Sequence, residues 1–182
     1  GVMPVDVERW QASILTAGGH KWLMSVGGCG FLYVDEKVID KLSPFNTGWL
    51  GQKDPLAFSH TLDPAPGTRR FEEGNPPMVA IYALDAALEL LESVGMENIK
   101  KHVMELGLRL TSGLESKAYR VESPQAEGEK SSITLFRGGP LSARMLNERL
   151  AEAGVICAIR SRGIRVSPHF YNNQEDIDRL LD

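Results

Sequence analysis

The sequence predicts an α/β protein, because short β-like segments and helical segments alternate along it. Two apolar segments, 13–17 and 30–34, read as strands, and they flank a glycine-rich turn. Over 78–94, apolar residues recur at helical spacing, and the same spacing resumes after Gly95. Beyond residue 119, strand-like and helical segments alternate again. These observations together predict the fold class.

In the first half of the chain, turns and one long loop join these elements. Asp6 is placed to cap a short helical turn over 7–11. Residues 43–77 carry repeated proline and glycine turn signals, so we expect a long loop with little regular structure. Loops of this length are usually functional.

The second half predicts a small domain with helices on one face of a sheet. Asn173 and Asp176 have the spacing of a capping box, which starts a last helix. We therefore expect residues 1–92 to be the end of a larger, truncated α/β domain and 93–182 to form a small C-terminal α+β domain, with a hinge near residue 95. The helix after Gly95 is expected to bury an apolar face of Ile99, Val103, Leu106, Leu110 and Leu114. Strands are expected over 119–123, 133–136, 155–159 and 164–167, and a further helix over 141–153.

The composition bounds the partners of the protein. Of its 182 residues 42% are hydrophobic and 24% charged, which is typical of a globular chain. A net charge of −4 and the absence of a dense basic run argue against nucleic acid and anionic membranes. Cys29 and Cys157 stand in unlike contexts without a secretory signal, so we expect free thiols and a cytoplasmic location.

Lys21 is the residue that points most directly to chemistry. It stands between two strands in Gly18-Gly19-His20-Lys21, and this context predicts a buried amine on a tight turn. Burial favours an uncharged amine, which can form a Schiff base with an aldehyde cofactor. The alternative is an ordinary lysine whose ammonium reaches solvent from a strand end.

Three separated motifs stand in order along the chain. They are His20-Lys21-Trp22, the segment Arg70-Phe71-Glu72-Glu73-Gly74-Asn75-Pro76, and the segment Arg165-Val166-Ser167-Pro168-His169-Phe170-Tyr171-Asn172. With these motifs nearly all of the chain resembles the C-terminal half of the class V aminotransferases. This fold-type I family uses pyridoxal 5'-phosphate (PLP) and includes cysteine desulfurases, selenocysteine lyases, kynureninase and isopenicillin N epimerase.

The resemblance implies a role for each motif residue near PLP. Lys21 would hold the cofactor as an internal aldimine and then move the substrate Cα proton. His20 would reach the cofactor phosphate, although Gly18 replaces a serine that is common in relatives. Asn75 stands where relatives have a threonine or serine that donates to the phosphate, and a carboxamide can donate as well.

Trp49 and Arg165 complete the expected site. Gly48-Trp49 resembles an element of kynureninase-like enzymes whose indole N–H donates to phosphate; packing under the loop is the alternative. The resemblance implies a homodimer in which Trp49 and Asn75 act on the neighbouring subunit's cofactor. Arg165 matches the arginine that grips the substrate α-carboxylate, and a surface ion pair is its alternative role.

The resemblance leaves the reaction open. The turn 160–163, where cysteine desulfurases carry their nucleophile, holds no cysteine, which disfavours a persulfide relay. Aminotransferase, selenocysteine lyase-like, epimerase and hydrolase reactions on a small amino acid remain. The phosphate loop, the residue that stacks on the cofactor ring and the aspartate that pairs with its nitrogen are expected upstream, so the isolated fragment is expected to be inactive. A catalytically silent assembly or dimerisation module is the alternative function.

The other histidines are expected to serve the structure. We interpret His60 and His102 as solvent-facing, because neither has a partner at metal-ligand spacing, and no metal site is predicted. His169 is expected to order the turn into the last helix.

Overall fold

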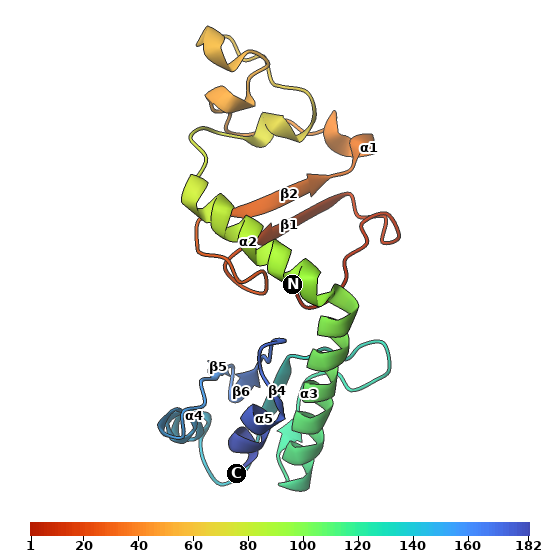
Figure 1. The fold of residues 1–182 in the computed structure, drawn as a ribbon, viewed down its shortest axis with the longest axis vertical. Coiled ribbons are helices and arrows are strands. Elements are labelled where there is room, and N and C mark those ends of the chain that lie inside the picture. The colour runs from red at the N-terminus through yellow and green to blue at the C-terminus, as the bar shows by residue number, and fades with distance from the viewer. The chain divides into compact units, whose positions relative to one another are not determined.

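A computed structural model describes residues 1–182, which divide into two compact units. Unit 1 comprises Gly1 and residues 5–93, and unit 2 comprises residues 2–4 and 94–182. Figure 1 shows the helices and strands of each unit. No helix is both long and apolar enough to cross a membrane.

Unit 1 is built on an antiparallel pair of strands, as predicted. Strand β1 (Ile14–Gly18) pairs with β2 (Gly30–Val34) over their whole length. Gly30 brings its backbone so close to Ala17 O that a side chain would collide with this oxygen. The loop between the strands carries Lys21, which therefore follows closely on the end of β1.

The segments beyond β2 hold more regular structure than the sequence predicted. Helix α1 (Glu36–Ile39) is capped by Asp35, whose carboxylate accepts from Lys37 N at 2.7 Å. The predicted long loop 43–77 is confirmed, because it contains no α-helix and no strand, only three short 3₁₀ helices. They are η1 (Trp49–Gly51), η2 (Pro55–Ala57) and η3 (Gly67–Phe71).

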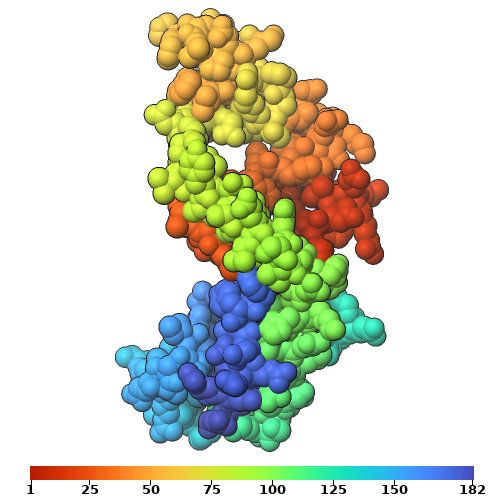
Figure 2. Space-filling model, viewed as in Figure 1, coloured from red at the N-terminus to blue at the C-terminus, as the bar shows by residue number.

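Helix α2 (Met78–Val94) begins and ends where the spacing of apolar residues predicts. One side packs against the loop after β1: Ser25 Oγ donates to Ala80 O at 3.4 Å, and a Cβ added at Gly19 would lie 3.4 Å from Leu84 Cδ1. The other side lies on the surface of unit 1 (Figure 2) and leaves Val79 82% exposed. The helix therefore supports the loop that carries Lys21.

Unit 2 combines helix α3 (Met96–Ser116) with a four-stranded antiparallel sheet in the order β3-β4-β6-β5. The predicted apolar face of α3 is confirmed, because all five of its residues are buried. The strands are β3 (Arg120–Val121), β4 (Thr134–Arg137), β5 (Ala158–Arg160) and β6 (Gly163–Val166). The core contains Leu106, Leu110, Leu114, Phe136, Leu150, Ile164, Val166, Ile177 and Leu180.

Two further helices complete unit 2. Helix α4 (Ala143–Glu152) is capped by Ser142, and α5 (Gln174–Leu181) begins with the predicted capping box. Asn173 Oδ1 accepts from Asp176 N at 3.0 Å, and Asp176 Oδ2 accepts from Asn173 N at 3.1 Å. Leu150 of α4 and Ile177 of α5 join one core with Ile164 of β6, so the helices cover one face of the sheet.

The opposite face of this sheet is not covered by that core. Because side chains alternate along a strand, Arg165 points away from the face that carries Ile164 and Val166. The register places Leu135 and Ala158 on either side of Arg165. We call this surface the open face of unit 2.

Candidate active site

The loop that carries Lys21 is held by backbone hydrogen bonds. Gly19 N donates to Cys29 O at 2.8 Å, and Ser25 N donates to Gly19 O at 2.9 Å. Met24 N donates to Lys21 O at 2.9 Å, which closes a turn at the lysine itself. Gly19 is buried, and a Cβ there would lie 3.1 Å from Cys29 O. The glycines therefore let the chain fold back tightly around Lys21.

The side chain of Lys21 is exposed, so the expectation of a buried amine was wrong for this chain. No hydrogen bond or ion pair engages Lys21 Nζ. The structure thus presents a free amine on a well-supported turn.

His20 lies beside Gly18 and is also exposed. A Cβ added at Gly18 would lie 3.1 Å from Cε1 and 3.2 Å from Nδ1 of His20. The imidazole ring therefore uses the space next to Gly18 that a serine side chain would fill. A serine at this position would push the ring aside.

The long loop brings the Trp49 and Asn75 segments together. A side chain at Gly48 would collide with Glu73 O, so only glycine permits this close approach of the two backbones. A Cβ added at Gly74 would lie 3.3 Å from Trp49 Nε1. The indole N–H of Trp49 thus lies beside the residue that precedes Asn75. Trp49 is 39% exposed and Asn75 is exposed, so both side chains reach the surface of unit 1.

Arg70 organises this loop, a role that its motif did not predict. Its Nε donates to Ala65 O and Gly67 O at 3.2 Å each, and its Nη1 donates to Ile39 O at 3.4 Å and Leu42 O at 3.3 Å. Its side chain is 14% exposed. The sequence signal was an arginine three residues after the proline- and glycine-rich segment 64–67, where backbone carbonyls lack partners from regular structure.

Arg165 occupies strand β6 of unit 2 and points to the open face. Its Nε is buried and has no hydrogen-bond partner. No carboxylate forms an ion pair with it, so the alternative of a surface ion pair finds no support. A buried, unsatisfied guanidinium N–H is uncommon and requires an explanation such as a bound acceptor.

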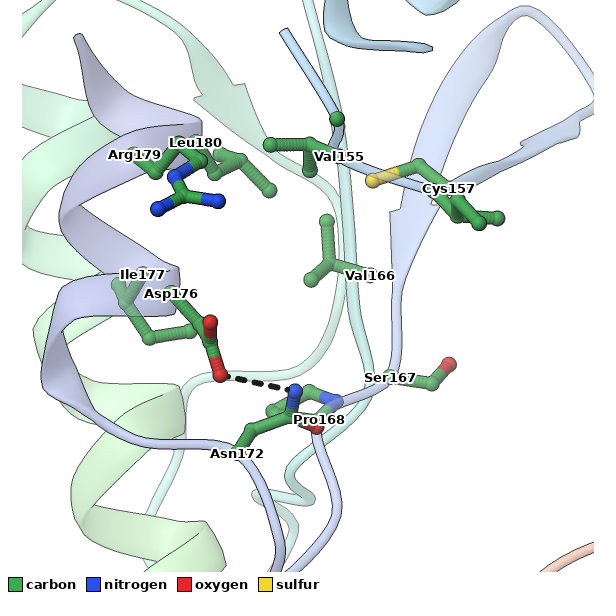
Figure 3. Close-up of a pocket in the computed structure, with 12 residues that line it drawn as sticks. Val155, Cys157, Val166, Ser167, Pro168, Asn172, Asp176, Ile177, Arg179 and Leu180 are labelled. Atoms are coloured by element: carbon green, nitrogen blue, oxygen red, sulfur yellow. Dashed lines mark hydrogen bonds between the residues drawn. The ribbon is translucent and has the colours of Figure 1, made fainter.

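Cys157 lines a cavity of about 150 Å³ on the core side of the sheet, together with Val155, Val166 and Leu180 (Figure 3). Burial raises the pKa of its thiol to about 11, which keeps the thiol protonated near neutral pH. The turn between β5 and β6 contains only Ser161 and Arg162. Neither Cys157 nor this turn therefore supplies a reactive thiolate.

The predicted roles of the other histidines had mixed outcomes. His60 is exposed, as expected. The solvent-facing assignment of His102 was wrong, because its Nε2 lies 2.8 Å from Asn172 O and the two form a hydrogen bond. His169 orders the turn before α5: its N donates to Asn172 Oδ1 at 3.0 Å and its ring accepts from Phe170 N at 2.8 Å.

The structure unites some of the predicted site residues and leaves others apart. Lys21 and His20 share one turn, and Trp49 lies beside the Asn75 segment. No hydrogen bond links the two pairs within this chain. Arg165 belongs to unit 2.

The sequence pattern of the family described as "Aminotransferase class-V" matches residues 1–180. An uncharacterized aminotransferase of Bacillus subtilis, YcbU, is 32% identical over 192 residues, which cover 100% of this chain and 47% of YcbU. A kynureninase of Deinococcus radiodurans is 31% identical over 170 residues, covering 90% of this chain and 41% of the kynureninase. The chain thus spans about half the length of these relatives.

A solved structure shows the same fold. The apo cysteine desulfurase of Thermococcus onnurineus matches with a TM-score of 0.88 at 24% identity, over 99% of this chain and 48% of the desulfurase. This likeness confirms the predicted α/β class and the partial fold-type I architecture. With a family pattern that extends over almost its whole length, the chain belongs to the class V aminotransferases.

Proposed function

We propose that this chain is the C-terminal half of a PLP-dependent enzyme that acts on a small amino acid, and that Lys21 holds the cofactor. The observation that carries the proposal is the unpartnered amine of Lys21 on a turn fixed by Gly19, Met24 and Ser25. A lysine that anchors an aldehyde needs this freedom, because an amine engaged in an ion pair is a poor nucleophile.

The donor groups present in unit 1 fit this cofactor. An aldehyde requires a free amine, which Lys21 offers, and a phosphate requires N–H donors. Exposed donors are available in the His20 ring, the Trp49 indole and the Asn75 carboxamide. We propose that His20 contacts the phosphate in the same subunit, and that Trp49 and Asn75 contact the phosphate bound to a partner subunit.

Unit 2 supplies the group for the substrate. The unsatisfied Nε of Arg165 and its planar guanidinium suit the α-carboxylate of an amino acid, which accepts two parallel hydrogen bonds. We propose that Arg165 binds the substrate in this way.

Proton transfer falls to Lys21. PLP, when bound, withdraws electrons from the substrate Cα and so acidifies its proton. Lys21 Nζ would accept that proton from the substrate Cα and return it. The exposure of Nζ gives substrate access to this position.

The chemistry of the cysteines narrows the choice of reaction type. A persulfide relay needs a thiolate near the substrate, whereas burial raises the pKa of Cys157 to about 11 and the turn before β6 carries no cysteine. We therefore favour an aminotransferase or an elimination of the selenocysteine lyase type over a relay through a cysteine of this chain.

Reductive labelling tests the proposal directly. The complete protein, with the segment expected before Gly1, is incubated with PLP, reduced with borohydride and digested. We expect a phosphopyridoxyl group on the peptide that contains Lys21, and none in Lys21→Ala. Exposed Lys37 on α1 belongs to the same unit, so Lys37→Ala serves as the matched control and should label normally. Label absent from Lys21 would overturn the enzyme assignment.

A subunit-mixing experiment tests the action across a dimer. Lys21→Ala and Asn75→Ala place their defects in different subunits' contributions to one site, so a mixed dimer contains one intact site. We expect each variant to be inactive alone and the mixture to regain activity. If no activity returns although mixed dimers form, the cross-subunit role of Asn75 is wrong.

An assembly module without catalysis is the second candidate. The loop 43–77 favours it, because this loop exposes large apolar side chains. The exposed fractions are 101% for Phe45, 74% for Leu56 and 72% for Phe58. A dimer that forms in the complete protein while Lys21 stays unlabelled would support the module and exclude the enzyme.

A further inference from the structure

The open face of unit 2 carries a row of arginines. The register pairs Arg120 with Arg137, and Arg160 with Gly163. Arg137 follows Phe136, which pairs with Ile164, so Gly163 lies opposite Arg137 and the row crosses all four strands. Paired residues share a face, and this row lies on the same side as Arg165.

Only part of this positive charge is neutralised by the protein. Glu122 Oε1 accepts from Arg120 Nε at 2.7 Å and from Arg137 Nε at 2.8 Å, so one carboxylate already serves two guanidinium groups. Arg160 Nη1 donates to the neighbouring Ile159 O at 2.9 Å and meets no carboxylate. Arg162, on the turn after β5, has no ion pair.

Three of these arginines, Arg137, Arg160 and Arg162, line a recess, a cavity of about 240 Å³. Its lining also comprises the carboxylate of Glu122, Ser161, the apolar Leu135, and Gly163, which contributes no side chain. Glu122 is the carboxylate already engaged by Arg120 and Arg137. A Cβ at Gly163 would lie 2.5 Å from Phe136 O and 3.2 Å from Leu135 Cδ1, so the close strand packing excludes a larger residue here. The lining charges without an ion-pair partner, those of the exposed Arg160 and Arg162, are therefore positive.

The recess lies next to the proposed carboxylate-binding arginine. Leu135, which lines it, pairs directly with Arg165, and Gly163 is two residues from Arg165 along β6. Two residues along a strand span roughly 7 Å. Side chains of arginine length bridge such a separation, so both sites can engage one small molecule.

We propose that the substrate carries a second acidic group on its side chain, and that Arg160 and Arg162 bind this group while Arg165 binds the α-carboxylate. The inference rests on the proposed function, since it gives the substrate class of the same site. An acidic side chain receives charge-assisted hydrogen bonds from two guanidinium groups. A neutral side chain of equal size leaves both charges unmatched, and this difference provides the discrimination.

Binding of two non-reacting probes tests the inference without assuming the reaction. Succinate carries two carboxylates, and succinamate has the same size with one carboxylate replaced by an amide. By calorimetry on the complete PLP-loaded protein, we expect succinate to bind at least about tenfold more tightly than succinamate. Arg160→Gln combined with Arg162→Gln should bring this ratio close to one.

Control variants separate a specific role from a general loss of charge. Arg144 on α4 pairs with Glu148 at 3.0 Å and does not line the recess, so Arg144→Gln should preserve the ratio. Arg160→Lys combined with Arg162→Lys should retain part of it, because the charge remains while the planar fork is lost. Turnover of L-aspartate relative to L-asparagine should follow the same order among the variants.

The outcomes distinguish this inference from the proposed function. If Lys21 is labelled by PLP but succinate and succinamate bind equally, the acidic substrate class is overturned and the enzyme assignment stands. A ratio that the double glutamine variant leaves unchanged also overturns it. If Lys21 is not labelled, the proposed function fails and the substrate inference fails with it.

Discussion

Arg109 and Asp178 form a two-pronged ion pair between helices α3 and α5. Arg109 Nε donates to Asp178 Oδ1 and Arg109 Nη2 donates to Asp178 Oδ2, each at 2.7 Å. The pair lies 69 residues apart in sequence and ties the last helix of the chain to the long helix of unit 2. The hydrogen bond from Arg109, and then its charge, lower the pKa of Asp178, while burial opposes the shift.

This pair predicts a pH-dependent stability of unit 2. Because the folded-state pKa of Asp178 is lowered, its stabilisation is fully present above the unfolded-state pKa of about 4 and is lost as the pH falls through the folded-state pKa. Thermal unfolding as a function of pH should show Asp178→Asn melting below the wild type at neutral pH and converging with it in acid. Glu105→Gln, on the exposed side of α3, should show no such convergence. Parallel curves for Asp178→Asn at all pH values would contradict the prediction.

The hydrogen bonds of Arg70 are expected to keep the long loop 43–77 in one conformation. In Arg70→Lys a single ammonium cannot reach the carbonyls of Ile39, Leu42, Ala65 and Gly67 together. Partly buried carbonyls are then left without a donor, at a cost of about 1–3 kcal/mol. Urea unfolding measures the loss, and hydrogen exchange should rise within 43–77. Lys41→Ala, at an exposed neighbouring position, should behave like the wild type; equal exchange in both variants would show that Arg70 does not hold the loop.

Position 48 is expected to require glycine, because the segments of the proposed phosphate donors Trp49 and Asn75 approach each other closely there. Gly48→Ala drives its methyl group into Glu73 O and must push the Trp49 and Asn75 segments apart. Strain of this kind costs about 1–3 kcal/mol. Gly27→Ala is the matched control, since a Cβ there meets nothing within 4 Å. Thermal unfolding of both variants should show a loss only for Gly48→Ala. A stable Gly48→Ala protein would mean that the loop does not need this close approach.

Cys157 predicts low thiol reactivity in the folded protein. Burial raises its pKa to about 11, so at about pH 8 little of it is thiolate. Mass spectrometry after iodoacetamide treatment should find Cys157 unmodified in the folded chain and alkylated in concentrated guanidinium chloride. A steep rise in modification between about pH 9 and pH 11 is expected while the fold persists. Rapid alkylation of Cys157 near neutral pH would contradict this prediction and remove the argument against a persulfide relay through this cysteine.

The helices and the strand pair of unit 1 follow from local sequence. Helix α2 runs from Met78 to Val94 as its spacing predicts, because a 3.6-residue period of apolar side chains is a property of the segment alone. The capping box at Asn173 is likewise complete within four residues. These features need no distant partner, so they are predictable from the sequence.

The strands of unit 2 agree less well with their sequence patterns. The pattern over 119–123 predicts five residues of strand, but β3 contains only Arg120 and Val121. The pattern over 155–159 predicts a strand that begins three residues earlier than the observed β5, Ala158–Arg160. A strand extends only as far as its neighbour offers hydrogen-bond partners, and that neighbour lies far away in the sequence. Its ends are therefore set by pairing.

The sequence by itself determined the fold class, the order of the motifs and the candidate site residues, Lys21 and Arg165 among them. Only the tertiary structure decided that Lys21 is exposed, that Trp49 lies beside Gly74, and that Arg160 shares the open face with Arg165. The physical reason is that residue types and their periods are local. Exposure and strand register depend on contacts between segments that are distant in the chain.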